Sequence, residues 1–379
     1  MITRLKVQGY KALRDLEVSF GQLSVLVGPN GCGKSSVLGA ITLLRDLALG
    51  KSGGNPGPPM PRGIASRDPE GGRENSPISV SMRRELRSRV LHVEGSFESH
   101  EEFPQYLDAE RSSLKVWFAG GEVAVVHKNW ARSTPELEES VEDILQYRFD
   151  SNAMSQPVYS EVARPRLAPS GENLAVVLDA LQGEHRERFE SIESDLCRFI
   201  PGLRRVRLHR VEMPVWRRVL VGNQYQQVQD NSVGHQVVLD FDFAKSVAAD
   251  QASEGTLLLL GLLTAIGVEP DKPATVMLDD LDRALHPKAQ RQLIEHLHAL
   301  LGQRPQLQII ATSHSPYLVE HLAYEEVLAM TQAREDGRSL IAPLAQHPEA
   351  EKWRDEMSAG EFWSSMGEDW IAQGRAASE

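Results

Sequence analysis

Residues 23–41 read LSVLVGPNGCGKSSVLGAI, and this stretch decides the fold. Its first five residues form a short continuous apolar run, which is typical of a strand buried on both faces of a sheet. A glycine-rich loop follows, and from about Lys34 to Leu49 the apolar residues recur at helical spacing. Strand, glycine loop and helix in this order are the context that a phosphate-binding P-loop requires, and a chance glycine turn seldom has it.

The loop at residues 28–35, GPNGCGKS, predicts a site for the phosphates of a nucleotide bound with Mg²⁺. Backbone N–H groups at the helix N-terminus can point at a phosphate, and glycine permits an approach that a Cβ would obstruct. Lys34 supplies a cation to the β- and γ-phosphates, and the Ser35 hydroxyl can ligate Mg²⁺. The residues expected to contact the nucleotide are Asn30, Gly31, Cys32, Gly33, Lys34, Ser35 and Ser36.

A second apolar strand ends in paired carboxylates, in the sequence TVMLDD at residues 275–280. This is the pattern of a Walker B motif, in which the first acid, Asp279, holds Mg²⁺ through water. The second acid, Asp280, orients or deprotonates the attacking water. Acids at a strand end are common, but a P-loop upstream makes this interpretation strong.

A third apolar strand leads into a histidine, in IIATSHSP at residues 309–316. The carboxyl ends of strands meet at the ligand site of an open α/β sheet. A lone histidine is usually structural, but beside the inferred γ-phosphate His314 is expected to be a polar sensor.

The bulk composition excludes several classes of protein. The 379 residues are 41% hydrophobic and 25% charged, as in an ordinary soluble globular protein. A net charge of -12 argues against indiscriminate coating of nucleic acid. Cys32 and Cys197 are the two cysteines and form no disulfide framework or metal-like spacing, which suggests a reducing, cytoplasmic compartment. The longest apolar run, residues 257–266, is too short to span a bilayer, so no membrane contact is expected.

The pattern along the chain predicts a split α/β core with insertions. Residues 1–50 and 237–345 form the core, and the Gly- and Pro-rich residues 51–77 form a flexible loop. Alternating segments within 78–130 predict an inserted antiparallel β sheet separate from the parallel core. Residues 131–236 form a helical and β lobe, with helices near 135–146 and 173–199 and strands near 204–212 and 217–227. Residues 346–379 are a C-terminal tail.

Together these segments resemble the ATP-binding-cassette (ABC) type head of bacterial AAA-family ATPases related to RecF, SMC and overcoming-lysogenization-defect (OLD) proteins. The matching pieces are GYKALRDLEV at 9–18, SEGTLLLL at 253–260, LDDLDRALHP at 278–287 and ATSHSP at 311–316, with RPRLAPSGENL at 164–174 similar to a stretch of this group's inserted lobe. The resemblance implies an α/β P-loop NTPase fold that uses ATP and Mg²⁺.

The resemblance also implies a head-to-tail homodimer or higher homo-oligomer with ATP between the chains. The SEGT segment corresponds to a signature motif that acts on the partner chain, so Ser253 and Gly255 would contact the γ-phosphate held by the other P-loop. His314 matches the switch histidine of such heads, and residues 282–286 match their D-loop.

Three departures from the family pattern bear on activity. Asp280 stands where a glutamate is usual, so turnover is expected to be slow or the site mainly to bind. Glu254 adds a negative charge to the signature segment, and Gln146 and Gln156 are weak candidates for the Q-loop glutamine. No acidic nuclease-type module is recognised after residue 345, so a nuclease or toxin effector would come from a separate chain.

Two further clusters have open interpretations. An arginine-dense segment could face DNA or could balance acids in salt bridges, and so could a second cluster at Arg83, Arg84, Arg87 and Arg89. The members of the first cluster are Arg198, Arg204, Arg205, Arg207, Arg210, Arg217 and Arg218. In the tail, Trp353, Phe362, Trp363, Met366 and Trp370 more often pack on their own domain than dock a partner.

Three functions stay open. The chain is a hydrolysing ATPase, sensor or motor, of a DNA-repair or antiphage defence system; a nucleotide-gated scaffold with slow hydrolysis; or a DNA clamp like RecF and SMC.

Overall fold

The computed structural model describes residues 1–49, 78–85, 90–97, 113–118, 123–127, 138, 140–221, 224–267 and 274–376. The chain divides into two compact units. The first contains residues 1–146, 272–282 and 294–379, and the second contains residues 147–271 and 283–293. The flexible loop expected at 51–77 lies outside the described residues, and the five-part division of the chain stays a prediction.

The first unit is built on a mainly parallel sheet in the order β15-β14-β3-β13-β12-β8. The strands β3 (Leu23–Val27), β13 (Leu307–Thr312), β12 (Ala274–Leu278) and β14 (Val327–Gln332) run parallel to one another. Every residue of β3 and β13 is buried, which explains why both strands are mainly apolar. The predicted P-loop, paired acids and histidine therefore follow strands that end at the same edge of one sheet.

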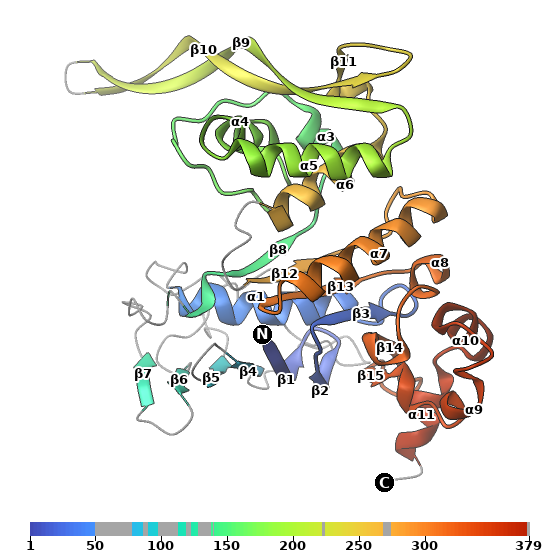
Figure 1. The fold of residues 1–379 in the computed structure, drawn as a ribbon. Helices are drawn as coiled ribbons and strands as arrows, with labels where there is room; N and C mark the ends of the chain where they lie inside the picture. The colour runs from blue at the N-terminus through green and yellow to red at the C-terminus, as the bar shows by residue number, and fades with distance from the viewer. Residues whose placement is uncertain are drawn as a thin grey trace. The chain divides into compact units, whose positions relative to one another are not determined.

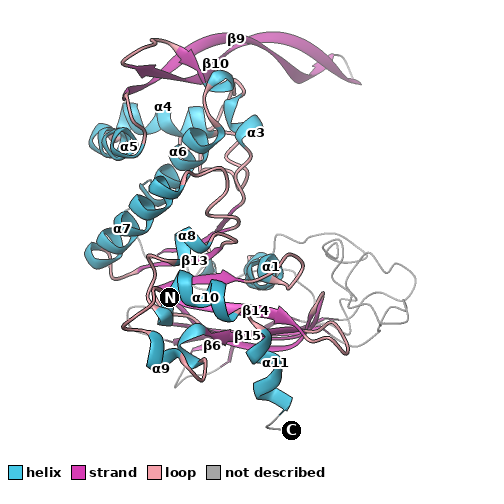
Figure 2. Cartoon of the chain, turned by 90° about the vertical axis from the view of Figure 1, so that its right-hand side faces the viewer, coloured by secondary structure: helices cyan, strands magenta, loops and turns pink. Residues whose placement is uncertain are grey.

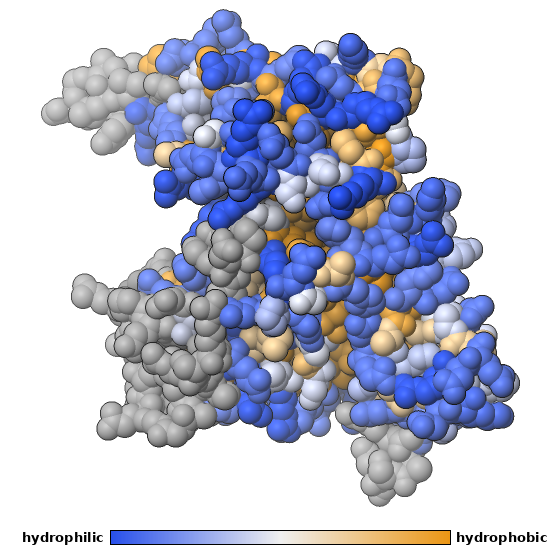
Figure 3. Space-filling model, in the orientation of Figure 1, coloured by the Kyte–Doolittle hydropathy of each residue, from blue (hydrophilic) through white to orange (hydrophobic). Residues whose placement is uncertain are grey.

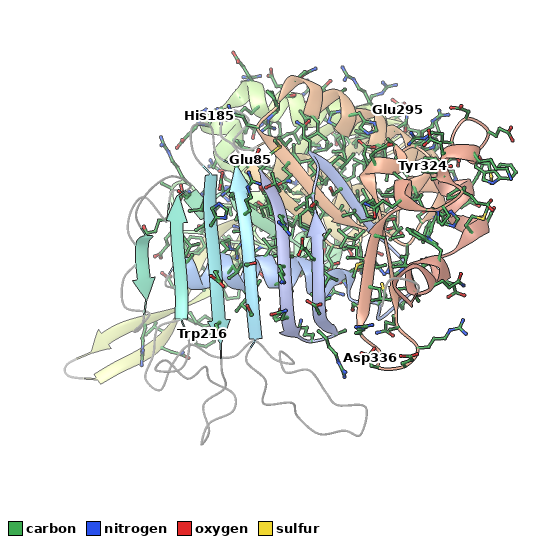
Figure 4. All side chains as sticks on the ribbon, turned by 90° about the horizontal axis from the view of Figure 1, so that it is seen from below. Glu85, His185, Trp216, Glu295, Tyr324 and Asp336 are labelled. Carbon is green, nitrogen blue, oxygen red and sulfur yellow. The ribbon has the colours of Figure 1, made fainter. Side chains whose placement is uncertain are left out.

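A second, antiparallel sheet has the order β2-β1-β4-β5-β6-β7, and Figure 4 looks onto it, with Glu85 labelled at the end of β4. Its strands are β1 (Ile2–Tyr10), β2 (Leu13–Ser19), β4 (Ile78–Glu85), β5 (Val90–Phe97), β6 (Ser113–Phe118) and β7 (Val123–His127). The predicted strands β4–β7 are antiparallel and lie outside the parallel sheet, and β4 pairs with β1, so they extend the N-terminal hairpin. The free edge of β1 offers backbone groups that need partners, and β4 supplies them.

Helix α1 (Lys34–Ala48) starts at the P-loop and lies between the two sheets (Figures 1 and 2). One hydrophobic core joins Leu38 and Ile41 of this helix to Leu5 of the antiparallel sheet and Met277 and Ile310 of the parallel sheet. Burial on both sides holds the helix, and with it the end of the P-loop, in a fixed position.

The helix predicted over 135–146 is wrong at its C-terminal end. Residues 138, 140 and 141 are helical, but Ile144–Tyr147 form strand β8 at the edge of the parallel sheet beside β12. The Thr275 N–H donates to the Asp143 carbonyl at 3.0 Å, so this edge supplies hydrogen bonds that a helix would leave unmade. Tertiary pairing thus overrides the local periodicity.

The tail packs on the first unit. It contains the helices α9 (Ala350–Trp353), α10 (Ala359–Met366) and α11 (Asp369–Ala376), and it follows α8 (Pro316–Val319) and β15 (Ser339–Pro343). Phe362 is fully buried, and the His347 ring lies edge-on to both Phe362 and Trp370. The interpretation that the tail aromatics pack on their own domain is confirmed for these residues.

The second unit combines helices with a long hairpin. Its helices are α3 (Ser151–Ser155), α4 (Leu174–Glu184), α5 (Arg186–Phe199) and α6 (Glu254–Gly267), and α7 (Pro287–Gln303) begins in it. Figure 3 shows mainly hydrophilic side chains over this unit, as expected for α5, which buries Phe189, Ile192, Leu196 and Phe199 on one side only.

The hairpin pairs β9 (Leu203–Val221) with β10 (Gln224–Phe241), and the short β11 (Val247–Ala248) pairs with the end of β10 (Figure 1). Residues 217–227, predicted as one strand, belong to two strands: residues 217–221 end β9 and residues 224–227 begin β10. None of the described helices is both long and apolar enough to cross a membrane.

Candidate functional site

Four residues at the carboxyl end of the parallel sheet form one chain of hydrogen bonds. The Ser35 hydroxyl donates to Asp279 Oδ1 at 2.9 Å, and the Thr312 hydroxyl donates to the same oxygen at 2.7 Å. The Asp280 N–H donates to Thr312 Oγ1 at 2.8 Å. The start of α1 and the ends of β12 and β13 are therefore tied together by Asp279. Sequence reasoning missed Thr312, although its place as the last residue of strand β13 was the available signal.

Lys34 is 5% exposed, and its ammonium group holds the P-loop closed on itself. Nζ donates to the Gly28 carbonyl at 2.8 Å and to the Pro29 carbonyl at 3.0 Å. An ammonium group has three donors. A phosphate entering the loop would thus meet a cation that the loop has already oriented.

Glycine is required at two positions of this loop. Gly28 has φ 142°, and a Cβ there would collide with the Met330 carbonyl of β14. Gly33 has φ 105°, and its Cβ would lie 2.5 Å from Ser339 Oγ on β15. The P-loop is therefore pressed against the β14–β15 hairpin. Gln332, at the end of β14, adds a hydrogen bond from Nε2 to the Gly31 carbonyl at 2.9 Å.

Cys32 is 1% exposed, and burial raises the pKa of its thiol, while the neighbouring Lys34 acts in the opposite direction. A thiol that stays protonated at neutral pH reacts slowly with oxidants. These properties favour Cys32 as a small residue that packs in the loop and argue against a role as a redox sensor.

Asp280 has a backbone conformation that few non-glycine residues adopt, with φ 59°. Its N–H is fixed by Thr312, and within the described part of the chain its carboxylate has no hydrogen-bond partner. The backbone of Asp280 is therefore fixed, and the oxygens of its half-buried carboxylate stay available to a water molecule. This is what a residue that orients a nucleophile needs.

The loops after β12 and β13 are joined at His314. Its backbone N–H donates to Asp282 Oδ1 at 3.1 Å, and its side chain is exposed. The structure thus brings His314 to the same edge of the sheet as Asp279 and Asp280.

Of the two Q-loop candidates, only Gln146 lies in the first unit. Its Oε1 accepts a hydrogen bond from the Thr42 hydroxyl of α1, the helix that begins at the P-loop. Gln156 follows α3 in the second unit and donates to Ser155 Oγ at 3.2 Å. Gln146 is therefore the better supported candidate.

The donors at this edge fit Mg²⁺. The ion prefers hard oxygen ligands and keeps several waters, so it needs few protein ligands. Ser35 and Asp279 offer a hydroxyl and a carboxylate whose oxygens lie 2.9 Å apart. No group of three or more His, Cys, Asp or Glu side chains suited to a metal exists among the described residues, so a transition-metal centre has no support there.

The predicted signature residues lie in the second unit, at the start of α6. Ser253 caps this helix: its Oγ accepts from the Thr256 N–H at 3.2 Å and lies 2.7 Å from Thr256 Oγ1. A Cβ on Gly255 would lie 2.5 Å from the Ala284 carbonyl, so glycine is needed where the two segments meet. Sequence reasoning did not foresee the capping role, which serine before a helix commonly has.

The second arginine cluster is not a DNA-facing patch at Arg84. This side chain is 1% exposed; it donates to the Ser140 carbonyl and pairs with Asp143 at 2.5 Å. Arg83 lies on the other face of β4 and pairs with Glu85, while Arg87 and Arg89 lie outside the described residues. The alternation of β4 forces one of two adjacent arginines inward, and the Asp143 carboxylate makes its burial tolerable.

The arginines of the hairpin pair with acids in several cases. Arg204 contacts Asp242 with both its Nε and Nη2 atoms, at 2.5 and 2.9 Å, and Arg207 pairs with Asp240 at 2.6 Å. Arg198 pairs with Asp195 at 3.2 Å on α5. Arg205 and Arg210 are exposed. The charge-balancing interpretation therefore accounts for three members of this cluster.

The family model described as "AAA domain, putative AbiEii toxin, Type IV TA system" matches residues 23–320. The chain belongs to this family. The OLD nuclease of Thermus scotoductus is 22% identical over 89% of this chain and 63% of its own length. The Septu protein PtuA of Bacillus thuringiensis is 38% identical over 16% of this chain and 14% of its own length. The chain thus spans less than two thirds of the length of either relative.

Among solved structures, the Smc head domain of Pyrococcus furiosus, crystallised with the C-terminal domain of ScpA, matches 94% of this chain and 98% of that chain. Its TM-score is 0.55 at 13% identity, a likeness that shows the fold. The predicted fold class, a P-loop NTPase head of ABC type with an antiparallel sheet and a helical lobe, is confirmed. So is the predicted kinship with OLD and SMC heads.

Proposed function

We propose that this protein binds and hydrolyses Mg²⁺·ATP, and that ATP holds two copies together as a head-to-tail dimer. The observation that carries the proposal is the hydrogen-bonded chain from Ser35 through Asp279 and Thr312 to Asp280, beside the buried Lys34. It gathers a cation, a pair of Mg²⁺ ligands and a carboxylate that has no hydrogen-bond partner among the described residues at one edge of the sheet, as phosphoryl transfer requires.

Each residue has one task in this mechanism. Lys34 binds the β- and γ-phosphates, and the backbone N–H groups of the P-loop orient them. Ser35 and Asp279 would hold the Mg²⁺ ion, and the ion would supply positive charge to the phosphates. Asp280 orients the attacking water, and His314 approaches the γ-phosphate from the next loop.

The dimer places the second unit of one chain against the P-loop of another. Ser253 and Gly255, at the start of α6, contact the γ-phosphate bound by the partner copy. ATP then bridges the two chains, and hydrolysis removes the bridge and lets the dimer open. The likeness to an Smc head supports a common fold, and the dimer itself is our proposal.

A second function, a nucleotide-gated scaffold with slow hydrolysis, is favoured by one observation. Asp280 is one methylene shorter than the expected glutamate, and its backbone has a φ of 59°. If a water lies beyond the reach of this shorter side chain, ATP binding still closes the dimer while turnover is slow. The steady-state rate of ATP hydrolysis separates the two functions.

We place the protein in an antiphage defence or DNA-repair system, in which it acts with a separately encoded nuclease or toxin effector. The support is the similarity to an OLD nuclease and to the Septu protein PtuA. A DNA clamp has less support because Arg84, Arg204 and Arg207 are engaged with acids. DNA contact through Arg205 and Arg210 stays a prediction.

The test is the mass of the protein in solution with Mg²⁺·ATP. The variants Asp280→Ala and Asp280→Asn are expected to lower turnover by about 100-fold or more, as loss of a general base does. They should therefore accumulate as dimers with ATP and as monomers without it. Asp369→Asn, at an exposed acid paired with Arg334, is the matched control and should behave as wild type. A monomeric Asp280→Ala variant at saturating ATP would contradict the proposal.

A further inference from the structure

The start of α6 carries a charge that a phosphate site should avoid. A helix N-terminus has a partial positive charge equivalent to roughly +0.5, which attracts anions. Glu254, the first residue of α6, sets a full negative charge there. It stabilises the helix itself, but it would repel the γ-phosphate that Ser253 and Gly255 are proposed to meet.

The same unit supplies a counter-charge at this point. Arg283 Nη2 lies 2.9 Å from Glu254 Oε1, and the two side chains are 48% and 40% exposed. With Arg283 in place, the carboxylate and the guanidinium cancel, and the helix N-terminus again carries a net partial positive charge. Without it, the carboxylate dominates.

The backbone holds Arg283 at this position from two sides. Ala284 has φ 56° and presents its carbonyl to Gly255, where a Cβ would come within 2.5 Å of that oxygen. On the other side, the buried Gln290 of α7 donates from Nε2 to the Leu285 carbonyl at 2.9 Å. Residues 283–285 are therefore held against the start of α6 by contacts within the second unit.

We propose that Arg283 is a positioning residue that neutralises Glu254, so that the start of α6 accepts the γ-phosphate of a nucleotide bound by a second copy of this chain. This inference rests on the proposed ATP-closed dimer. It explains how a signature segment that contains Glu254 can still bind the γ-phosphate. It also makes the short segment after the paired acids part of the dimer contact through its charge.

The experiment measures ATP-driven dimerisation in the slowly hydrolysing Asp280→Asn background, by sedimentation with Mg²⁺·ATP. Arg283→Ala should raise the protein concentration at half-dimerisation about tenfold, because a bare carboxylate then faces the phosphate. Arg186→Ala is the matched control. It breaks another arginine–glutamate pair of the second unit, with Glu190 at 2.8 Å, and should change that concentration by less than about twofold.

A second variant separates charge from structure. In Glu254→Gln/Arg283→Gln both charges are gone, so dimerisation should return to within about threefold of the parent if neutralisation is the role of Arg283. Salt should also shrink the Arg283→Ala defect, because screening weakens the repulsion between carboxylate and phosphate. All variants should unfold at the same temperature as the parent, since exposed ion pairs add little to stability.

Two results would overturn the inference while the dimer stands: an Arg283→Ala variant that dimerises like its parent, or a double variant as weak as Arg283→Ala. A parent that stays monomeric with Mg²⁺·ATP would instead disprove the proposed function, and the inference with it.

Discussion

Helix α1 in the first unit and helix α6 in the second both begin beside glycines, yet they differ in the charged side chains at their N-termini. At the P-loop, Lys34 is 5% exposed and bonded to two carbonyls of its own loop. At α6, Glu254 and Arg283 are 40% and 48% exposed and pair with each other. In the first region a buried ammonium group is positioned to bind an anion. In the second, a carboxylate and a guanidinium group neutralise each other at the protein surface.

The largest effect is expected at the preorganised region. Lys34→Ala removes the ammonium from the β- and γ-phosphates, where hydrogen bonds to charged groups contribute roughly 1.5–3 kcal/mol each. ATP binding should therefore weaken by about 100-fold or more, to the point of being undetectable in a fluorescent-nucleotide titration. Gln332→Ala is the control, because its amide contacts the same loop only at the Gly31 carbonyl.

If Gln332→Ala weakens ATP binding as much as Lys34→Ala, ATP affinity depends on the shape of the loop and not on the Lys34 ammonium group. That result would contradict the difference described between the P-loop and the start of α6. We expect a change of less than about threefold, as for the loss of one neutral hydrogen bond.

The second prediction extends the contrast to two arginines on one strand. Arg84 is 1% exposed and paired with Asp143, whereas Arg83 is 47% exposed and paired with Glu85. Arg84→Met should destabilise the protein by about 3 kcal/mol, because it leaves the partly buried Asp143 carboxylate, which is 19% exposed, without its partner. Arg83→Met should cost about 1 kcal/mol or less. The shift of the urea midpoint of the first unit measures both.

Arg84→Met/Asp143→Leu sharpens this test. Since replacing both members of a buried pair by apolar groups is often neutral, the double variant should recover most of the loss. An Arg84→Met variant as stable as Arg83→Met would show that Arg84 is not the structural residue described above.

Most of the parallel sheet and its site followed from local sequence, because a P-loop joins strand, glycine turn and helix within a few residues. Local sequence also predicts the apolar strands at Leu23 and Ile309 and the paired acids Asp279 and Asp280. The wrong predictions concern residues whose partners are distant in the sequence. Strand β8 forms because an edge beside β12 is open, and Arg84 is buried because Asp143 meets it.

The predicted site also lacked residues that act through the fold. Thr312 links Asp279 to the Asp280 backbone, and its place at the end of its strand was the one sequence signal of that contact. Arg283 pairs with Glu254 although nearly thirty residues separate them in the sequence. The local sequence of the signature segment therefore shows the acid without the arginine that neutralises it.

The most direct test of the proposed dimer mixes two defective chains. Lys34→Ala lacks the P-loop cation, and Ser253→Arg fills the exposed start of α6 with a bulky side chain, each in the Asp280→Asn background. Each variant alone should remain monomeric with Mg²⁺·ATP. Their mixture should form dimers, because the P-loop of the Ser253→Arg chain and the intact α6 of the Lys34→Ala chain make one complete site. A mixture that stays as monomeric as its components would contradict the account.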